Sequence, residues 1–328
     1  MEERTALGID IAKEKYDVRI EVKGRSKKKQ FENTPSGHAG LLVWLKQLGI
    51  EQVHACMEAT GTYGEALAEY LYKAGHRVSV VNPARIKGHA QSQMKRHKTD
   101  DLDAEVIRHF CETQNPEVWQ PPAPEIKALR AMTRRLDDLI HLRTQEANRL
   151  QSGGTTQVVQ DSIQHMLDYI DQQIAQLEQL IDDHIRRHPK LAHQVELITS
   201  IPGLGERTAL KLVAEFLDIA SYDSARSLAA SVGVTPAHHR SGSSVHSQPH
   251  ISKIGNAALR GALWWPAVSA IRHNPIIRDF AVKLRKAKKH NFAIIIAAIR
   301  KLLHLVYGVI KNDAPFDQNW HSTSPLAP

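Results

Sequence analysis

Four acidic residues stand at positions where a metal-binding carboxylate cluster can form. Asp10 ends one apolar run and Glu58 ends another. Asp100 and Asp103 lie three residues apart in a segment with helical periodicity, so their side chains share one helix face. Asp101 points off that face and does not belong to the set. A cluster of this kind predicts chemistry on a phosphodiester.

The chemistry follows from how close carboxylates behave. They raise each other's pKa, so a cluster is costly unless cations neutralise it. Two Mg²⁺ ions would do so, since Mg²⁺ prefers oxygen ligands and a metal pair can activate a nucleophile and stabilise a leaving oxygen. Each acid also has a simpler interpretation: Asp100 can cap a helix, Asp103 can lie in its first turn, and Asp10 can be a loop residue. Glu58 is harder to explain in that way, because it separates an apolar strand from Thr60-Gly61-Thr62.

The elements that would position these acids form an α/β pattern over residues 1–115. Alternation and apolar runs predict strands at Thr5–Ile11, Tyr16–Val22, Lys27–Thr34, Val53–Met57 and Arg77–Val81, and helices at Ser36–Leu48 with Ser36 as N-cap, Tyr63–Ala74 and Asp100–Glu112. This order predicts a mixed sheet flanked by helices. In a ribonuclease-H-like topology the first and fourth strands are neighbours, so the four carboxylates would meet at one edge of the sheet.

A second region, residues 116–190, follows a proline-rich break and predicts a helical hairpin. Ile126–Leu150 has helical periodicity, and apolar residues from Ile163 to Ile185 alternate steps of four and three, which is a heptad seam. Gly153 and Gly154 lie in the connection. We expect an antiparallel coiled-coil hairpin used for oligomerisation, with an intramolecular spacer as the alternative.

The third region, residues 191–328, is mainly helical and contains a helix-hairpin-helix pattern from Leu197 to Ala209. Gly203 and Gly205 would let the backbone approach a phosphate, and Arg207 and Lys211 would add charge. Such contacts position nucleic acid without reading bases. The alternative is a tight turn between two packed helices.

Charge favours a nucleic acid partner. The chain carries 43 Lys and Arg against 35 Asp and Glu, a net charge of +8. Basic clusters recur at Lys23–Lys29, Lys95–Lys98, Arg134–Arg135 and Lys283–Lys289, which suits a protein wrapped by a polyanion better than one with a single basic tail.

Other classes of protein fit poorly. Cys56 and Cys111 give neither a disulfide framework nor metal-ligand spacing, which favours a reduced, cytoplasmic setting. The longest apolar run, Phe292–Ile299, is shorter than a membrane span needs, and the N-terminus lacks the features of a secretory signal. We therefore expect no membrane partner.

Four blocks of sequence resemble a known family. They are Gly8–Lys13 (GIDIAK), Glu58–Tyr63 (EATGTY), Val81–Pro83 (VNP) and Lys98–Ala104 (KTDDLDA). These blocks resemble the signatures of the DEDD-type insertion-sequence transposases, relatives of the Piv DNA invertases with a RuvC-like N-terminal domain. The resemblance implies that the family's acidic tetrad corresponds to Asp10, Glu58, Asp100 and Asp103.

The segment from Gly233 to Arg260 resembles the family's C-terminal transposase domain. Its catalytic serine would correspond to Ser241, with Ser243 and Ser244 as alternatives. Composition alone indicates a flexible Ser-Gly-Ser-Ser loop with no adjacent base to activate a hydroxyl. The nucleic-acid contacts expected in this block are Lys253 and Arg260.

The resemblance implies a mechanism and partners. The carboxylates would hold Mg²⁺ at a scissile phosphate while Ser241 attacks it, so that a phosphoserine link preserves bond energy for strand exchange. Relatives join the serine domain of one subunit to the RuvC-like domain of another, as dimers that assemble into tetramers. Target and donor double-stranded DNA would be selected by a structured bridge RNA, in a prokaryotic cytoplasm at the nucleoid.

Two other functions remain open. A RuvC-like structure-specific nuclease would use metal-activated water, and Ser241 would be incidental. A non-catalytic scaffold would bind RNA or DNA through the helix-hairpin-helix and the coiled coil.

Overall fold

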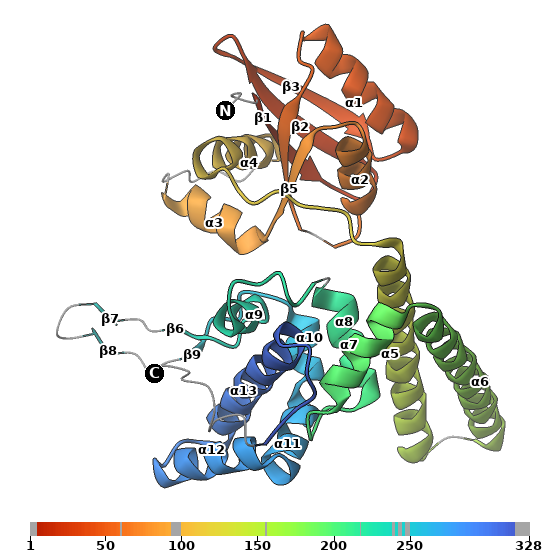
Figure 1. Cartoon of the computed structure of the whole chain (residues 1–328). Coiled ribbons are helices and arrows are strands. Elements are labelled where there is room, and N and C mark those ends of the chain that lie inside the picture. The colour runs from red at the N-terminus through yellow and green to blue at the C-terminus, as the bar shows by residue number, and fades with distance from the viewer. Residues whose placement is uncertain are drawn as a thin grey trace. The chain divides into compact units, whose positions relative to one another are not determined.

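The computed structural model describes residues 5–59, 61–92, 100–154, 156–216, 218–237, 240–241, 245–246 and 250–318, of which the side chains at 100–102, 237, 240–241, 245–246 and 250 are outside the description. The chain divides into two compact units, Met1–Pro121 and Pro122–Pro328 (Figure 1). The boundary falls in the proline-rich break, and the finer division of the second unit at residue 190 stays a prediction.

Unit 1 is built on a five-stranded mixed sheet, as the sequence predicts. Its strands are β1 (Thr5–Ile11), β2 (Lys15–Val22), β3 (Arg25–Glu32), β4 (Val53–Glu58) and β5 (Arg77–Val81), in the order β3-β2-β1-β4-β5. The first three strands pair antiparallel, whereas β1–β4 and β4–β5 pair parallel. The inner strand β4 is buried on both faces from Val53 to Met57, which explains its unbroken apolar character.

Helices cover both faces of this sheet (Figure 1). Their bounds are α1 (Pro35–Gln47), α2 (Glu65–Lys73), α3 (Pro83–Ser92) and α4 (Asp100–Gln114). Leu7 and Ile9 of β1 join Leu41 and Leu67 in the core beneath α1 and α2. On the opposite face, Cys56 packs among residues of α3 and α4. The alternation of side chains along β1 and β4 therefore decides which residues face α4.

Two helix starts differ from the sequence expectation. Thr34, not Ser36, caps α1: its hydroxyl accepts a hydrogen bond from the Gly37 amide at 3.2 Å. The reason is Pro35, which starts the helix and holds the preceding residue extended. Helix α3 was not expected at all, and it begins where Asn82 Oδ1 accepts the Ala84 amide at 2.9 Å.

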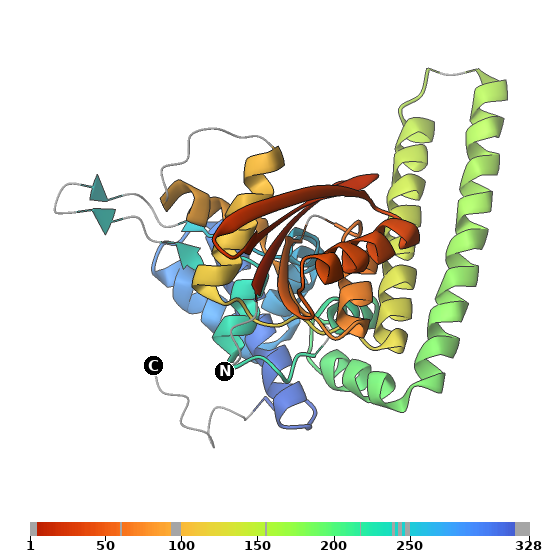
Figure 2. The same ribbon diagram turned by 90° about the horizontal axis from the view of Figure 1, so that it is seen from above.

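In unit 2, α5 (Pro124–Gln151) and α6 (Gln157–Arg187) form the predicted antiparallel hairpin, seen as two long green helices in Figure 2. Leu129 and Ile181 at its base belong to the core of unit 2. Farther out, Arg143 pairs with Asp171 at 2.5 Å across the two helices. The heptad seam is thus used within the chain.

The rest of unit 2 is helical, with two short strand pairs. Its elements are α7 (Pro189–Thr199), α8 (Glu206–Phe216), α9 (Ala225–Ser231), β6 (Pro236–Ala237), β7 (Arg240–Ser241), β8 (Val245–His246), β9 (His250–Ile251), α10 (Ala257–Ala262), α11 (Trp264–His273), α12 (Pro275–Lys286) and α13 (Asn291–Lys311). Strand β6 pairs with β9, and β7 with β8. Among the described helices α13 alone is long and apolar enough to cross a membrane, but half of its apolar window is buried in the core, as in any central helix.

Candidate active site

Two of the predicted acids are neighbours in the sheet of unit 1. The parallel register of β1 and β4 pairs Ile9 with Met57, so Asp10 and Glu58 are the next positions along the two strands. Because side chains alternate in step along parallel neighbours, both acids lie on one face. Each side chain is partly exposed. The sequence prediction that these strands are adjacent is confirmed.

Helix α4 lies against the same face. Gly8, two residues before Asp10, faces α4 so closely that an added Cβ would lie 2.1 Å from the Ala104 carbonyl oxygen and 2.4 Å from the Arg108 amide nitrogen. Glycine is therefore required at this point by the approach of two backbones. This contact fixes the first turns of α4 over the strand that carries Asp10.

The direction of α4 brings its N-terminus to the ends of the strands. Cys111, near its C-terminus, donates a hydrogen bond to the His54 carbonyl at 3.3 Å, and His54 lies early in β4. The other end of α4, with Asp103, therefore lies toward the end of β4 where Glu58 stands. Asp103 is partly exposed, and Asp100 begins the helix with its side chain outside the described set.

The sequence prediction missed a further carboxylate. Asp17 on β2 pairs directly with Asp10 on β1, and both lie on the face toward α4. Gln30 on β3 donates to both Asp17 carboxylate oxygens, at 3.0 and 3.1 Å. Gln30, Asp17, Asp10 and Glu58 thus form one row across the four strands β3, β2, β1 and β4. Only the pairing register reveals it, since nothing near Asp17 in the sequence resembles a motif.

Asn33 joins the loops that follow the two acids. Its amide nitrogen donates to the Ala12 carbonyl at 3.2 Å, just after β1, and to the Tyr63 carbonyl at 3.0 Å, beyond β4. The buried His38 ring donates to Asn33 Oδ1, with the two atoms 3.1 Å apart. Burial lowers the pKa of His38, which keeps the ring neutral near pH 7. The side chain of Asn33 thereby fixes the relative position of the two loops.

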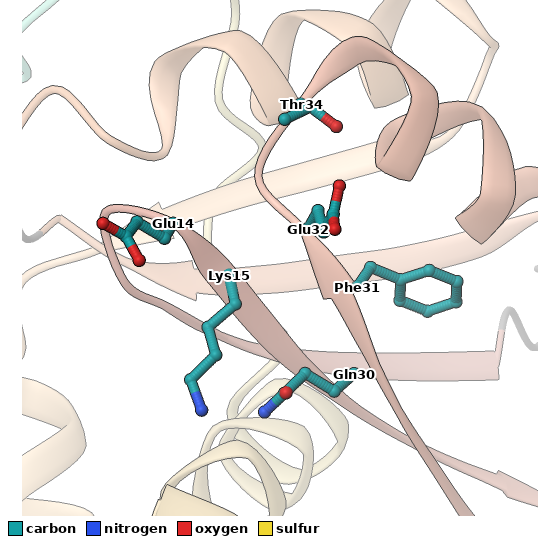
Figure 3. Close-up of a pocket in the computed structure, with 6 residues that line it drawn as sticks. All are labelled: Glu14, Lys15, Gln30, Phe31, Glu32 and Thr34. Atoms are coloured by element: carbon teal, nitrogen blue, oxygen red, sulfur yellow. The ribbon is translucent and has the colours of Figure 1, made fainter.

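An open hollow lies beside this row, where β1 turns into β2 and β3 meets α1 (Figure 3). Lys15 and Gln30 point to the same side of the sheet there, while Phe31 points away. The residues that line the hollow are Glu14, Lys15, Gln30, Phe31, Glu32 and Thr34. The hollow contains two acids and one lysine, and it borders the row of polar side chains through Gln30.

The donor set suits a hard divalent cation, since Asp10 and Glu58 present oxygen ligands on adjacent strands. Among the residues whose side chains are described, no group of three or more His, Cys, Asp or Glu is arranged to hold a metal ion. That set does not include the side chain of Asp100. Completion of the cluster by Asp100 and Asp103 therefore remains a prediction.

The predicted nucleic-acid residues of the hairpin after α7 make contacts within unit 2. Arg207 pairs with Glu178 at 2.6 Å, and Lys211 pairs with Asp137. Gly203, with φ of +104°, is pressed against α11, where an added Cβ would lie 2.6 Å from the Ala270 Cβ. An added Cβ at Gly205 would meet nothing within 4 Å. These contacts supply the structural role that the sequence left as the alternative, and DNA binding here stays a prediction.

The serine block is described mainly by its backbone. Ser241 pairs with Val245 across β7 and β8, while Ser243 and Ser244 lie outside the described residues. Lys253 is exposed with φ of +55°, and Arg260 donates from Nη1 to the Val232 carbonyl at 2.9 Å. The role of the serine hydroxyl stays a prediction.

Comparison with known proteins identifies the family. Residues 7–153 match the transposase domain described as DEDD_Tnp_IS110, and residues 195–281 match the transposase IS116/IS110/IS902 family. The chain is 35% identical over 326 residues to the pilin gene-inverting protein of Moraxella bovis, covering 97% of this chain and 99% of that protein. It belongs to the IS110 family of transposases. The transposase for insertion sequence element IS1111A of Coxiella burnetii is 23% identical over 307 residues, 83% of this chain and 79% of that protein.

Membership in the IS110 family makes the chain a DNA-recombining enzyme and excludes the non-catalytic scaffold. The DEDD domain implies dependence on a divalent metal ion, and the matched residues 7–153 include nearly the whole sheet of unit 1. Family membership therefore gives DNA as the substrate class of the protein.

Proposed function

We propose that this IS110-family protein cleaves and rejoins DNA at a carboxylate site formed by Asp10, Glu58, Asp100 and Asp103 on a RuvC-like, ribonuclease-H-type domain. The observation that carries the proposal is the register of β1 and β4, which makes Asp10 and Glu58 neighbours beneath the start of α4. The strand order β3-β2-β1-β4-β5, with antiparallel strands followed by parallel ones, supports the assignment of this fold.

The cation we propose is Mg²⁺, as two ions. When bound, it would activate the nucleophile and stabilise the leaving oxygen. The acids hold the ligand oxygens in place because Asp10 and Glu58 project from a rigid sheet, and Asn33 ties together the loops beyond them. Asp17 is held by Gln30 and adds negative charge next to Asp10, which strengthens the demand for a cation.

For the attacking group, the match of residues 7–153 to the DEDD transposase domain favours the RuvC-like route. In that route a water oxygen bonds to phosphorus at the carboxylate site, the bond from phosphorus to the leaving strand oxygen breaks, and the water proton passes to that oxygen. The strand hydroxyl released in this way can attack a second phosphodiester during rejoining. The second candidate is Ser241, supported by its position within the matched residues 195–281. In that route a bond forms between Ser241 Oγ and phosphorus, the bond from phosphorus to the leaving strand oxygen breaks, and the serine proton passes to that oxygen. The covalent link then preserves the bond energy for rejoining.

One experiment separates the two routes. Reactions of the wild-type protein, Asp10→Asn, Glu58→Gln and Ser241→Ala are stopped in denaturant and resolved on denaturing gels. We expect both carboxylate variants to lose cleavage, and their retention of recombination would overturn the site assignment. Free cleaved ends that persist in Ser241→Ala support water, while protein-linked DNA that disappears in this variant establishes serine.

We further propose target and donor duplex DNA and a bridge RNA as partners, in the cytoplasm. The edge strand β3 presents three exposed consecutive lysines, Lys27, Lys28 and Lys29, whose charge suits a polyanion. RNA that co-purifies with the wild-type protein and is lost when these lysines become glutamine would support this proposal. The result that contradicts it is a protein active without RNA.

An oligomer, from dimer to tetramer, is proposed on the outer side of α6. Val158, Met166 and Tyr169 are at least half exposed there. Apolar groups of this kind at a helix surface favour contact with another chain. Light scattering should report a multiple of the chain mass, and Tyr169→Glu should reduce it; a monomeric wild-type protein would contradict the proposal.

A further inference from the structure

Four basic residues gather on two packed helices of unit 2, away from the residues discussed above. Arg300, Lys301 and His304 lie on α13, where positions four apart share a face, and Arg226 lies on α9, which packs against α13 (Figure 1). The three α13 side chains are partly buried, whereas Arg226 is exposed. This cationic cluster therefore extends from the packed helices to the surface.

The cluster contains buried polar atoms with unmet hydrogen-bonding capacity. Within the described part of the chain, Arg300 Nε and His304 Nε2 are buried and have no hydrogen-bond partner. Native proteins satisfy nearly all such atoms, because water is lost on burial and must be replaced. An unmet guanidinium nitrogen and imidazole nitrogen on one helix face need a group that can accept or donate a hydrogen bond.

The cluster also lacks compensating charge. Two cations elsewhere in the described residues have acidic partners: the buried Arg108 pairs with Glu105 at 2.7 Å, and the partly buried Lys211 pairs with Asp137. None of the four cluster residues takes part in an ion pair found among the described side chains, and α13 contains neither Asp nor Glu from end to end. Among the side chains that the structure describes, the positive charge of the cluster therefore has no acidic partner.

The titration of the cluster reflects this imbalance. Burial lowers the pKa of Lys301. Burial, followed by the positive charges of Arg300, Lys301 and Arg226, lowers the pKa of His304 to about 4. The folded protein thus holds the His304 ring neutral and leaves its Nε2 atom without a hydrogen-bond partner among the described residues.

We propose that the cationic cluster is a phosphate-binding site that receives a backbone phosphodiester of nucleic acid. A phosphodiester oxygen accepts hydrogen bonds from a guanidinium and an ammonium group, and its charge offsets the mutual repulsion of the cations. The exposed Arg226 gives the anion a route from solvent. The proposal rests on the proposed function only in taking DNA or RNA as the source of the phosphate.

The test measures affinity for a labelled 25-base-pair DNA duplex and for an RNA hairpin by fluorescence anisotropy, at several salt concentrations and without turnover. Arg300→Met should weaken binding about tenfold and reduce the salt slope by about one, because one phosphate contact is lost. Arg272→Met removes the same charge from an exposed position on α11 and should change affinity less than about twofold. Lys301→Gln is the second variant if Arg300→Met does not fold.

Thermal unfolding distinguishes a binding site from a structural one. The melting temperature of Arg300→Met should equal or exceed that of the wild-type protein, because a repelling buried cation is removed. A lower melting temperature with unchanged affinity and salt slope would establish a structural role and overturn the proposal. Stabilisation by inorganic phosphate beyond chloride of equal ionic strength, with unaltered duplex and hairpin binding in Arg300→Met, would show a free-phosphate site instead.

Loss of this site and failure of the proposed chemistry are distinguishable. Asp10→Asn should bind both nucleic acids with the wild-type dependence on the cluster even though it does not cleave. If Arg300→Met lowers affinity in the Asp10→Asn background as well, the phosphate site is supported independently of catalysis. Wild-type affinity in that double variant would overturn it.

Discussion

Replacing Gly8 with alanine should push helix α4 away from β1 and displace one side of the candidate active site. The new Cβ would lie 2.1 Å from the Ala104 carbonyl oxygen and 2.8 Å from the Arg108 Cα, and both are backbone atoms that cannot swing aside. Gly8 is not among the glycines with positive φ, so alanine suits its backbone conformation and the effect is steric. The helix must retreat by more than about 1 Å to reach an ordinary contact distance of about 3.5 Å.

Two magnitudes follow from that displacement. Overpacking of this kind costs about 1–3 kcal/mol of the free energy of unfolding. A displacement of about 1 Å between groups that must act together costs about a hundredfold in rate. Recombination by Gly8→Ala should therefore fall about a hundredfold at a temperature where the variant is still folded, because Asp103 moves with α4 while Asp10 stays on the sheet.

The assay compares urea unfolding with recombination of paired plasmids. Gly40→Ala is the matched control, since its Cβ would meet only Phe31 ring atoms, at 3.6 and 3.7 Å, in the interior of α1. That variant should gain about 0.5–1 kcal/mol and keep its activity. Recombination by Gly8→Ala within about threefold of the wild-type rate would refute the reasoning that α4 carries part of the site, since about a hundredfold loss is expected.

Three further predictions follow from side chains outside the acidic tetrad. Asn33→Ala should raise the Mg²⁺ concentration needed for half-maximal cleavage and lower the unfolding free energy by about 1–2 kcal/mol, because two hydrogen bonds between loops are lost. An unchanged Mg²⁺ titration would contradict the positioning role of Asn33. Gly203→Ala should lower the free energy of unfolding in urea by at least about 2 kcal/mol, because positive φ and the contact with α11 both oppose a side chain. Gly205→Ala should be near neutral, and equal effects of the two substitutions would contradict the packing argument. Burial raises the pKa of Glu215, but the hydrogen bond and charge of Arg134, the charge of Arg130 and the hydrogen bond from Asn256 together lower it below its ordinary value. The stability that this carboxylate contributes is therefore present above its unfolded pKa and is lost as pH falls through the folded pKa. Arg134→Met should flatten this acid limb in thermal unfolding, and an unchanged limb would count against the pair.

Much of unit 1 was predictable because its signals are local. The bounds of β1 and β5 follow from apolar runs and alternation, and the strand that ends in Glu58 is apolar throughout because it is buried on both faces. The start of α1 is set by Pro35, so the cap is Thr34 and the prediction of Ser36 was wrong. Helix α3 was missed because it carries few apolar side chains and buries only Ile86, so no apolar stripe marks it in the sequence.

The candidate site was predictable only in part. The positions of Asp10 and Glu58 at strand ends are sequence features, and their adjacency follows once the strand order is assumed. The partnership of Asp17 with Asp10, and the bridge made by Asn33, depend on the pairing register and on loop closure. Neither residue lies in a recognisable motif, because the atoms that they contact are distant in sequence.

The sequence by itself determined which segments form strands and helices, that acids stand at the strand ends, and that the family is that of DNA transposases. Only the tertiary structure decided that Gly8 must be glycine, since the reason is the α4 backbone. It alone showed that the atoms Arg300 Nε and His304 Nε2 are buried with no hydrogen-bond partner in the described part of the chain. Periodicity and capping act over a few residues and can be read along the chain, whereas steric approach and electrostatic compensation depend on residues that meet only when the chain folds.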